Sequence, residues 1–206
     1  MNVTAPGLPG VLLFEPDAFE DSRGYFQETW NRDRYAAAGL KARFVQDSLS
    51  FSKNGVLRGL HLQNPNGQGK LVSVLSGEVF DAIADVRRGS PAFGRWFGCV
   101  LSARNRLQMW IPPGFAHGFC VLSPSALFHY KCTRLYDPRS EIGIRWNDPA
   151  IGIPWPIKRP ILSGKDLALP LLAEIPARRL PRWNPAEGGA RGASPPRREG
   201  GGKAHA

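Results

Sequence analysis

The chain has 206 residues and a formal net charge of +10, from 27 Lys and Arg residues against 17 Asp and Glu residues. This length suits one well-buried core, because single all-β domains commonly reach about 200 residues. No apolar run approaches the roughly 18 residues that a helix needs to span a bilayer. The N-terminus also lacks the basic and apolar regions of a signal peptide. We therefore expect one cytoplasmic domain without a membrane partner.

Much of the positive charge lies at the C-terminal end. Residues 175–206 contain seven Arg and Lys residues and two Glu residues, so they carry half of the net charge. This segment is rich in Gly, Pro and Arg and poor in apolar residues, a composition typical of disordered chain. The sequence therefore predicts a folded domain over residues 1–174 and a disordered, dispensable tail over residues 175–206, with no nucleic-acid partner.

Short β-type runs separated by turn residues recur from residue 11 to about residue 146. Their spacing of roughly 8 to 12 residues is typical of an all-β sandwich or barrel. The expected strands are 11–14, 24–29, 44–52, 57–62, 70–75, 78–86, 95–101, 107–111, 118–122 and 126–134. A short helix is expected over 32–38, with Asn31 as its N-cap and Gly39 ending it. Frequent prolines after residue 146 predict an extended wrap over the barrel, followed by an apolar segment at 167–172.

The most informative stretch is a predicted hairpin with arms at residues 55–63 and 70–75 and a turn rich in Asn, Pro and Gly. Arg58 and His61 lie on the first arm, and Lys70 begins the second. These three basic side chains suit an anionic substrate and proton transfer, although a surface hairpin with scattered charges is also compatible with the pattern. Strict alternation would separate Arg58 from His61, whereas a bulge at Gly59 would direct both into the same interior.

A second stretch contains the pattern Pro-x-Gly-x-x-His, which ends at His117 and resembles the second half of the cupin signature. A metal-binding cupin supplies two further ligands, a histidine and a carboxylate, after the position that His61 would occupy. Here Gln63 stands in place of that histidine, and no Glu follows before Glu78. Two imidazoles alone make a poor metal site. We therefore expect a barrel without a metal, and we expect the three cysteines to be free thiols because their spacing fits no ligand pattern.

In a barrel without a metal, proton transfer would depend on side chains. The candidate acids and bases are His61, Lys70, His117, Tyr130 and Tyr136. Asp166 follows the last predicted strand and could return to orient a histidine, because a His–Asp pair fixes the ring tautomer and raises its basicity. From the residues alone, structural roles are the more common ones: His117 as a structural histidine, Tyr136 as a packed aromatic and Asp166 as a surface helix cap.

Nine short sequence blocks occur in a fixed order between Leu13 and Leu172. As a set they are far more specific for one protein family than any single block. They are Asp21-x-Arg23-Gly24-x-Phe26-x-Glu28, Gln46-Asp47, Gly55-Val56-Leu57-Arg58-Gly59-Leu60-His61-x-Gln63, Gln68-Gly69-Lys70, Gly77-Glu78-Val79-x-Asp81, Ser90-Pro91-x-Phe93-Gly94, Pro113-Gly114-Phe115-Ala116-His117-Gly118-Phe119, Trp146-Asn147-Asp148-Pro149 and Leu162-Ser163-x-Lys165-Asp166. Together they resemble the dTDP-4-dehydrorhamnose 3,5-epimerase family.

The resemblance implies a metal-free cupin jelly roll, a homodimer, and cofactor-independent epimerisation of a dTDP-4-keto-6-deoxy sugar at C3 and C5 in dTDP-L-rhamnose biosynthesis. Both carbons flank the C4 ketone, so loss of either proton gives an enolate. The implied catalytic residues are His61 as the base, Asp166 to orient it, Lys70 to stabilise the enolate oxygen and Tyr130 as the acid. The implied substrate-binding residues are Arg23, Arg58 and His117 on the diphosphate, Phe26, Glu28 and Gln46 on the thymidine, and also Tyr136 and Lys165.

The sequence departs from the family in one place. After Gln46-Asp47 the family usually has Asn and then polar or basic residues, whereas this chain has Ser48-Leu49-Ser50-Phe51. Some relatives act at only one carbon or on another 4-keto sugar, so a single-site epimerase remains an alternative. Two further alternatives are a metal-dependent cupin oxygenase or isomerase and a non-catalytic sugar-nucleotide binding module. The binding module is disfavoured, because it would not need His61, Lys70, Tyr130 and Asp166 together.

Overall fold

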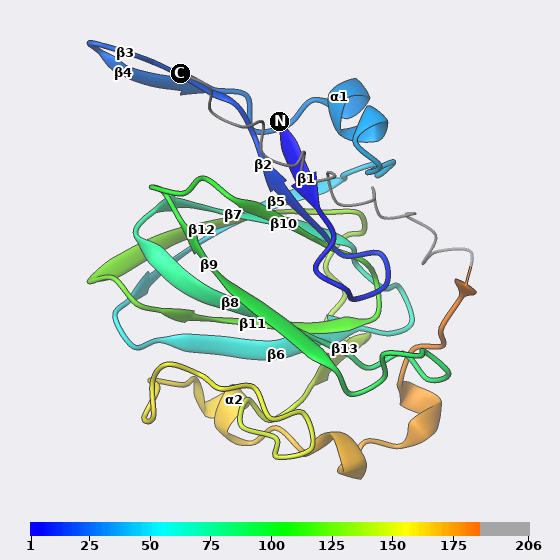
Figure 1. The fold of residues 1–206 in the computed structure, drawn as a ribbon. Coiled ribbons are helices and arrows are strands. Elements are labelled where there is room, and N and C mark those ends of the chain that lie inside the picture. Colours follow the sequence, from blue (N-terminus) through cyan, green and yellow to red (C-terminus); the bar gives the residue numbers. More distant parts are fainter. Residues whose placement is uncertain (186–206) are drawn as a thin grey trace, which may run out of the picture.

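The structure is a computed structural model that describes residues 1–185. Eleven strands form two antiparallel sheets that face each other, as Figure 1 shows. One sheet contains β1 (Asn2–Thr4), β2 (Leu12–Glu15), β5 (Gln46–Lys53), β7 (Lys70–Ser76), β10 (Gln108–Ile111) and β12 (Ser125–Cys132). The other contains β6 (Leu57–Gln63), β8 (Glu78–Asp85), β9 (Trp96–Ser102), β11 (Phe115–Val121) and β13 (Glu141–Gly143). The expected all-β jelly-roll barrel is confirmed.

The strand order is β1-β2-β10-β7-β12-β5 in the first sheet and β13-β6-β11-β8-β9 in the second. A separate hairpin of β3 (Ala18–Asp21) and β4 (Gly24–Gln27) projects from the barrel (Figure 1). The short helices are α1 (Arg32–Ala37), α2 (Gly164–Leu167), and two 3₁₀ turns, η1 (Leu172–Glu174) and η2 (Ala177–Arg179). No helix in residues 1–185 is long and apolar enough to cross a membrane.

All ten strands expected from the sequence are present, with ends that differ by at most three residues. The expected helix is α1, and the Asn31 side chain caps it by accepting hydrogen bonds from the backbone N–H groups of Asp33 and Arg34, each at 3.1 Å. The sequence pattern missed β1, β3 and β13, because strands of three or four residues are too short to show a period. In the apolar segment expected at 167–172, Leu167 ends α2, Leu172 begins η1, and residues 168–171 link the two.

The main core lies between the sheets. Val72, Met109 and Phe128 come from the six-stranded sheet, and they meet Ile83 and Phe119 from the five-stranded sheet. Every one of these side chains is buried, because alternate residues of each strand point into the space between the sheets. The interior is therefore built by both sheets in equal measure.

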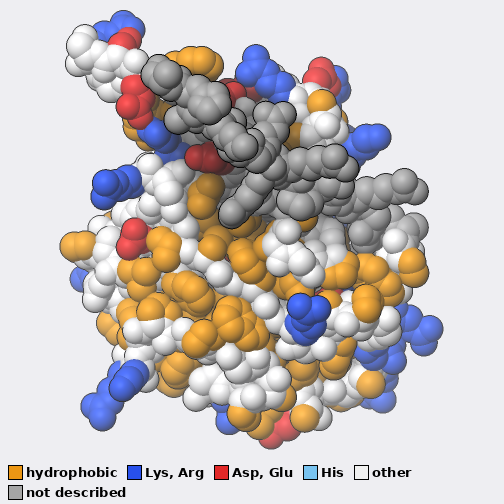
Figure 2. All heavy atoms as spheres, in the orientation of Figure 1, with side chains coloured by type: hydrophobic (Ala, Val, Ile, Leu, Met, Phe, Trp, Pro, Cys, Tyr) orange, Lys and Arg blue, Asp and Glu red, His pale blue; other side chains and the backbone are white. Residues whose placement is uncertain are grey.

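The outer face of the five-stranded sheet is covered by the chain that follows β13. Ile144, Ile151 and Ile153 pack there against strand residues such as Leu62 and Ala84. This is the extended wrap that the prolines predicted. Figure 2 shows a further group of hydrophobic side chains on the surface over β8 and β9.

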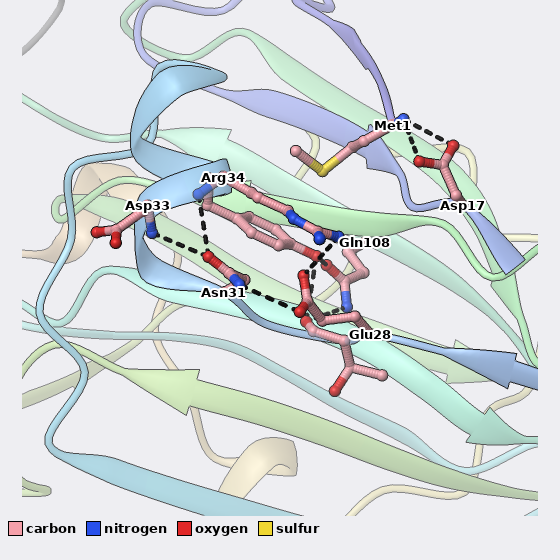
Figure 3. A network of polar contacts seen from close by, with 9 residues as sticks. Met1, Asp17, Glu28, Asn31, Asp33, Arg34 and Gln108 are labelled. Atoms are coloured by element: carbon pink, nitrogen blue, oxygen red, sulfur yellow. Dashed lines mark hydrogen bonds and ion pairs between the residues drawn. The ribbon is translucent and has the colours of Figure 1, made fainter.

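The outer face of the six-stranded sheet is covered by α1 and its flanking residues. The Tyr35 hydroxyl donates a 2.6 Å hydrogen bond to Gln108 on β10. Glu28 accepts a hydrogen bond from Asn31 at 3.1 Å and pairs with Arg34 at 3.3 Å, so the start of the helix is tied to the chain before it (Figure 3). These contacts fix α1 over one half of the sheet.

The other half of this outer face is bare among the described residues. Leu49 and Phe51 on β5 are 55% and 61% exposed, and Leu75 on β7 is also exposed. β5 is the edge strand of the sheet. An apolar strip at a sheet edge is unusual for a chain that remains alone, because natural proteins protect such edges.

The segment expected to be a disordered tail is ordered in its first part. Ile175 and Leu180 are buried against the five-stranded sheet, and the Trp183 ring lies 4.3 Å from the guanidinium carbon of Arg87. The backbone N–H of Trp183 also donates to the carbonyl of Arg88 at 2.9 Å. The expectation of disorder is therefore wrong for residues 175–185. The rest of that segment, 186–206, lies outside the described residues.

We expect deletion of residues 175–206 to destabilise the fold. The deletion exposes the surface under Ile175 and Leu180, and each large apolar side chain contributes about 1.5–3 kcal/mol when buried. A melting temperature lower by on the order of 10 °C is expected for a chain of this size. Deletion of residues 186–206 keeps these contacts and is the matched control. Equal melting temperatures for both truncations would contradict this account.

Candidate active site

A cavity of about 450 Å³ lies in the barrel interior. Its charged and polar lining residues come from both sheets, from α2 and from the residue before α2: Ser50, Arg58, His61, Lys70, His117, Tyr130, Ser163, Lys165 and Asp166. A second cavity of about 350 Å³ also has His61, Lys70 and Tyr130 in its lining, together with Gln46, Tyr136 and Glu141. The three shared residues therefore stand where the two cavities meet.

A bulge in β6 directs Arg58 and His61 into the same cavity. The register pairs His61 with His117 and Arg58 with Phe119, so two residues of β6 face the single residue Gly118 of β11. Gly59 has a φ of +124°, and a Cβ added there would lie 2.6 Å from the Gly118 Cα. The bulge inferred from the sequence is confirmed, and only glycine fits at this position.

His61 is held by the carboxylate of Asp166. The His61 Nε2 and the Asp166 Oδ1 are 2.6 Å apart, and the Ser163 hydroxyl caps α2 by accepting from the Asp166 N–H at 3.1 Å. Burial by itself would raise the pKa of Asp166, but the hydrogen bond and charge of His61 outweigh it, so this pKa is lowered. Since the charged carboxylate accepts the Nε2 proton, Nδ1 of His61 remains free to take another.

A second histidine–carboxylate pair lies deeper in the interior. His117 Nε2 donates to Asp81 Oδ2 at 2.9 Å, and Asp81 is fully buried. Burial raises the pKa of Asp81, against the opposing effects of His117 and Lys70. The sequence analysis gave Asp81 no role, yet its inward alternation with Val79 and Ile83 could have identified a polar residue in the core.

Lys70 and Tyr130 lie on neighbouring strands of the six-stranded sheet, across the interior from His61. Burial lowers the pKa of Lys70, while Cys132, Asp81 and Glu141 oppose the shift. Burial, followed by Cys132, raises the pKa of Tyr130, and a hydrogen bond with Ser48 and the charge of Arg58 act against it. A neutral phenol therefore faces an imidazole from the opposite wall of the cavity.

The second cavity contains a small polar network centred on Glu141. The Tyr136 hydroxyl donates to Glu141 Oε2 at 2.7 Å, and Lys165 Nζ lies 2.6 Å from the same oxygen. Gln46 Oε1 accepts from the Tyr136 backbone N–H at 2.8 Å. The structure thus brings together three of the expected substrate-binding residues around Glu141, which the sequence analysis missed because β13 is too short to be predicted.

Three expected site residues lie outside both cavities of this chain. Arg23 and Phe26 belong to the projecting hairpin, where the Arg23 side chain is 88% exposed and pairs with Asp21, and Phe26 is 71% exposed. Glu28 is engaged with Asn31 and Arg34 beside α1 (Figure 3). The structure of one chain therefore does not join these residues to His61.

The remaining expected residue, Arg58, is fixed at the cavity wall by its Nε, which donates to the Ser52 hydroxyl at 3.0 Å. Residues 1–185 contain no group of three or more His, Cys, Asp and Glu side chains that could hold a metal ion. Each of the two cavity histidines has a carboxylate partner instead. Cys99, Cys120 and Cys132 are free thiols, as expected.

Comparison with known proteins identifies relatives of this chain. Residues 6–174 match the family model for dTDP-4-dehydrorhamnose 3,5-epimerase. The chain is 55% identical to the dTDP-4-dehydrorhamnose 3,5-epimerase of Neisseria gonorrhoeae over 82% of its length, but it spans only 52% of that relative. It is 53% identical to the enzyme of the same name from Shigella flexneri, covering 81% of this chain and 93% of that relative.

A solved structure gives the same result for the fold. The dTDP-6-deoxy-D-glucose-3,5-epimerase of Legionella pneumophila, solved in complex with dTDP-4-keto-L-rhamnose, superposes with a TM-score of 0.86 at 50% identity. The match covers 89% of this chain and 98% of the other. From the family match, the sequence identity and the shared fold, the chain belongs to the dTDP-4-dehydrorhamnose 3,5-epimerase family.

Proposed function

We propose that this protein epimerises dTDP-4-dehydro-6-deoxy-D-glucose at C3 and C5, which gives dTDP-4-dehydro-L-rhamnose. The observation that carries the proposal is the 2.6 Å pair of His61 and Asp166 at the wall of the cavity that also contains Lys70 and Tyr130. A relative with 50% identity has been solved with dTDP-4-keto-L-rhamnose bound, which supports a sugar nucleotide of this class as the substrate.

In the proposed mechanism, His61 removes the proton from C3 or C5, and Asp166 holds the imidazole and stabilises its charged form. The electron pair of the broken C–H bond moves into the bond to C4, so negative charge develops on the C4 oxygen. Lys70 is suited to stabilise that oxygen as a nearby cation. Each positioned proton-transfer group contributes on the order of 10²–10⁴ in rate.

Inversion requires that the new proton arrive on the opposite face of the ring. His61 belongs to β6 in one sheet, whereas Tyr130 belongs to β12 in the other. The two side chains therefore approach the cavity from facing walls, and the neutral phenol of Tyr130 has a proton to give. This arrangement supports Tyr130 as the acid. Arg58, held by Ser52, is suited to the diphosphate because a guanidinium binds phosphate oxygens in a fork.

We also propose a homodimer in which the hairpin of each protomer reaches the pocket of the other. Two observations support it: Arg23 and Phe26 are exposed on a projecting hairpin, and Leu49 and Phe51 leave an apolar strip on the edge strand. A two-fold interface would cover such a strip on both copies. The free thiols support the expected cytoplasmic location, because disulfides are rare in reducing compartments.

The base is tested by His61→Asn. We expect this variant to lose deuterium uptake at both C3 and C5 when dTDP-4-keto-6-deoxyglucose is incubated in heavy water and followed by NMR. Binding of dTDP should remain close to wild type, because Arg58 is untouched. Deuterium exchange at the wild-type rate would contradict the assignment of His61 as the base. In the wild-type protein, exchange and inversion at only one of the two carbons would identify a single-site epimerase instead.

The acid is tested by Tyr130→Phe. His61 could still remove protons and return them on its own face, so solvent exchange should persist while epimerisation falls by about 10² or more. The measurement is the ratio of deuterium incorporation to inverted product in the same NMR experiment. If both fall in equal proportion, Tyr130 serves only to position the substrate, and Tyr136 in the second cavity becomes the better candidate.

The shared pocket is tested by mixing two inactive variants, Arg23→Ala and His61→Asn. A mixed dimer would have one intact site, with His61 from one protomer and the hairpin from the other. Random exchange should then restore about a quarter of the wild-type activity. Mixing His61→Asn with Asp166→Asn is the control, since both changes damage a chain's own pocket and no intact site can form. Absence of recovery in the first mixture, despite exchange, would refute the shared pocket.

A further inference from the structure

Three serines alternate along one face of the edge strand β5. Ser48 and Ser50 line the two cavities, and Ser52 is buried. The residues between them, Leu49 and Phe51, point to the outside. The strand period of two therefore places three hydroxyls in a row on the wall of the proposed active site.

Two of these hydroxyls have hydrogen-bond partners, whereas the middle one has none within residues 1–185. Ser48 Oγ accepts a hydrogen bond from Gln46 Nε2 at 3.0 Å. Ser52 Oγ accepts from Arg58 Nε at 3.0 Å. Ser50 Oγ is buried and has no hydrogen-bond partner among the described residues.

The surroundings of Ser50 explain why no protein group satisfies it. Phe128 is its neighbour across the strand pair, and Phe119 and Leu57 belong to the same cavity lining. Buried hydroxyls are almost always hydrogen-bonded, because an unsatisfied one loses its interaction with water without compensation. A polar group that lines a cavity and lacks a partner among the described residues is suited to a ligand atom.

The position of Ser50 along the strand indicates which ligand atom. Successive inward residues are about 6.6–6.8 Å apart, so Ser50 stands between Ser48, which contacts Tyr130, and Ser52, which holds Arg58. In the proposed function, the sugar ring lies at Tyr130 and the diphosphate lies at Arg58. The nucleoside then continues beyond Arg58, away from Gln46, so this arrangement replaces the thymidine contact that the family resemblance implies for Gln46. The atoms that join these two parts of the substrate would pass in front of Ser50.

We propose that Ser50 is a further substrate-binding residue, whose hydroxyl donates a hydrogen bond to an oxygen of the phosphoryl group that carries the sugar. The inference rests on the proposed function for the identity of the ligand. An anionic oxygen is the strongest acceptor that the substrate offers, and the Ser50 hydroxyl has its proton free to donate. No bond to the substrate is broken or formed by this residue, which contributes binding and placement.

The test is calorimetric titration of wild-type and Ser50→Ala protein with dTDP and with dTMP. The terminal phosphoryl group of dTDP corresponds to the one that carries the sugar, and dTMP lacks it. We expect Ser50→Ala to raise the Kd for dTDP by about 10- to 100-fold, the range for a hydrogen bond to a charged group. The Kd for dTMP should be unchanged. Ser76→Ala, on an exposed serine at the end of β7, is the matched control and should change neither constant.

The melting temperature without ligand separates a binding role from a structural one. Since Ser50 Oγ has no partner to lose, Ser50→Ala should melt at or above the wild-type temperature. A lower melting temperature, an unchanged Kd for dTDP, or equal weakening of dTDP and dTMP would each overturn the proposal. Deuterium exchange of the substrate by the wild-type protein is measured in parallel. Absence of exchange, with dTDP binding intact, would refute the epimerase function. The binding data would still decide whether Ser50 contacts the terminal phosphoryl group of dTDP.

Discussion

The close approach of Gly59 and Gly118 is the constraint on which the site depends. A Cβ on Gly59 would collide with the Gly118 backbone, and one on Gly118 would lie 2.7 Å from the Arg58 carbonyl oxygen. Each glycine inside a strand costs about 0.5–1 kcal/mol relative to alanine. The two glycines permit the bulge that turns Arg58 and His61 to the same side of β6. Without it, Arg58 and His61 would face opposite sides of β6.

The ionisable groups of the interior interact with one another. Asp166 and Asp81 each bind a histidine, and the charge of Lys70 opposes the effect of burial on Asp81. Removing either histidine would leave a buried carboxyl group without its hydrogen-bond partner, which typically costs about 1–3 kcal/mol. The same groups that suit proton transfer therefore also stabilise one another in an otherwise apolar barrel.

Much of the architecture could be predicted from the sequence, because strands of seven or eight residues show their alternation and because Asn31 and Gly39 mark the ends of α1. The pairing of His61 with Asp166, 105 residues apart, could be proposed only through the family resemblance, since it depends on where the proline-rich wrap ends. Glu141 was missed because β13 has three residues. Residues 175–185 were expected to be disordered because composition was averaged over the whole segment 175–206. A few apolar side chains such as Leu180 are enough to order residues 175–185.

Residues 48–51, which depart from the family pattern, alternate between the two faces of β5. Ser48 and Ser50 face the cavities, so this part of the wall remains polar. Leu49 and Phe51 face outward and do not contact the cavities, so they have no direct means of selecting which carbon is inverted. Burial of each would contribute about 1.5–3 kcal/mol, which favours association through β5. The same four residues thus divide between two faces of β5: the inward pair lines the cavities, and the outward pair is exposed at the edge of the sheet.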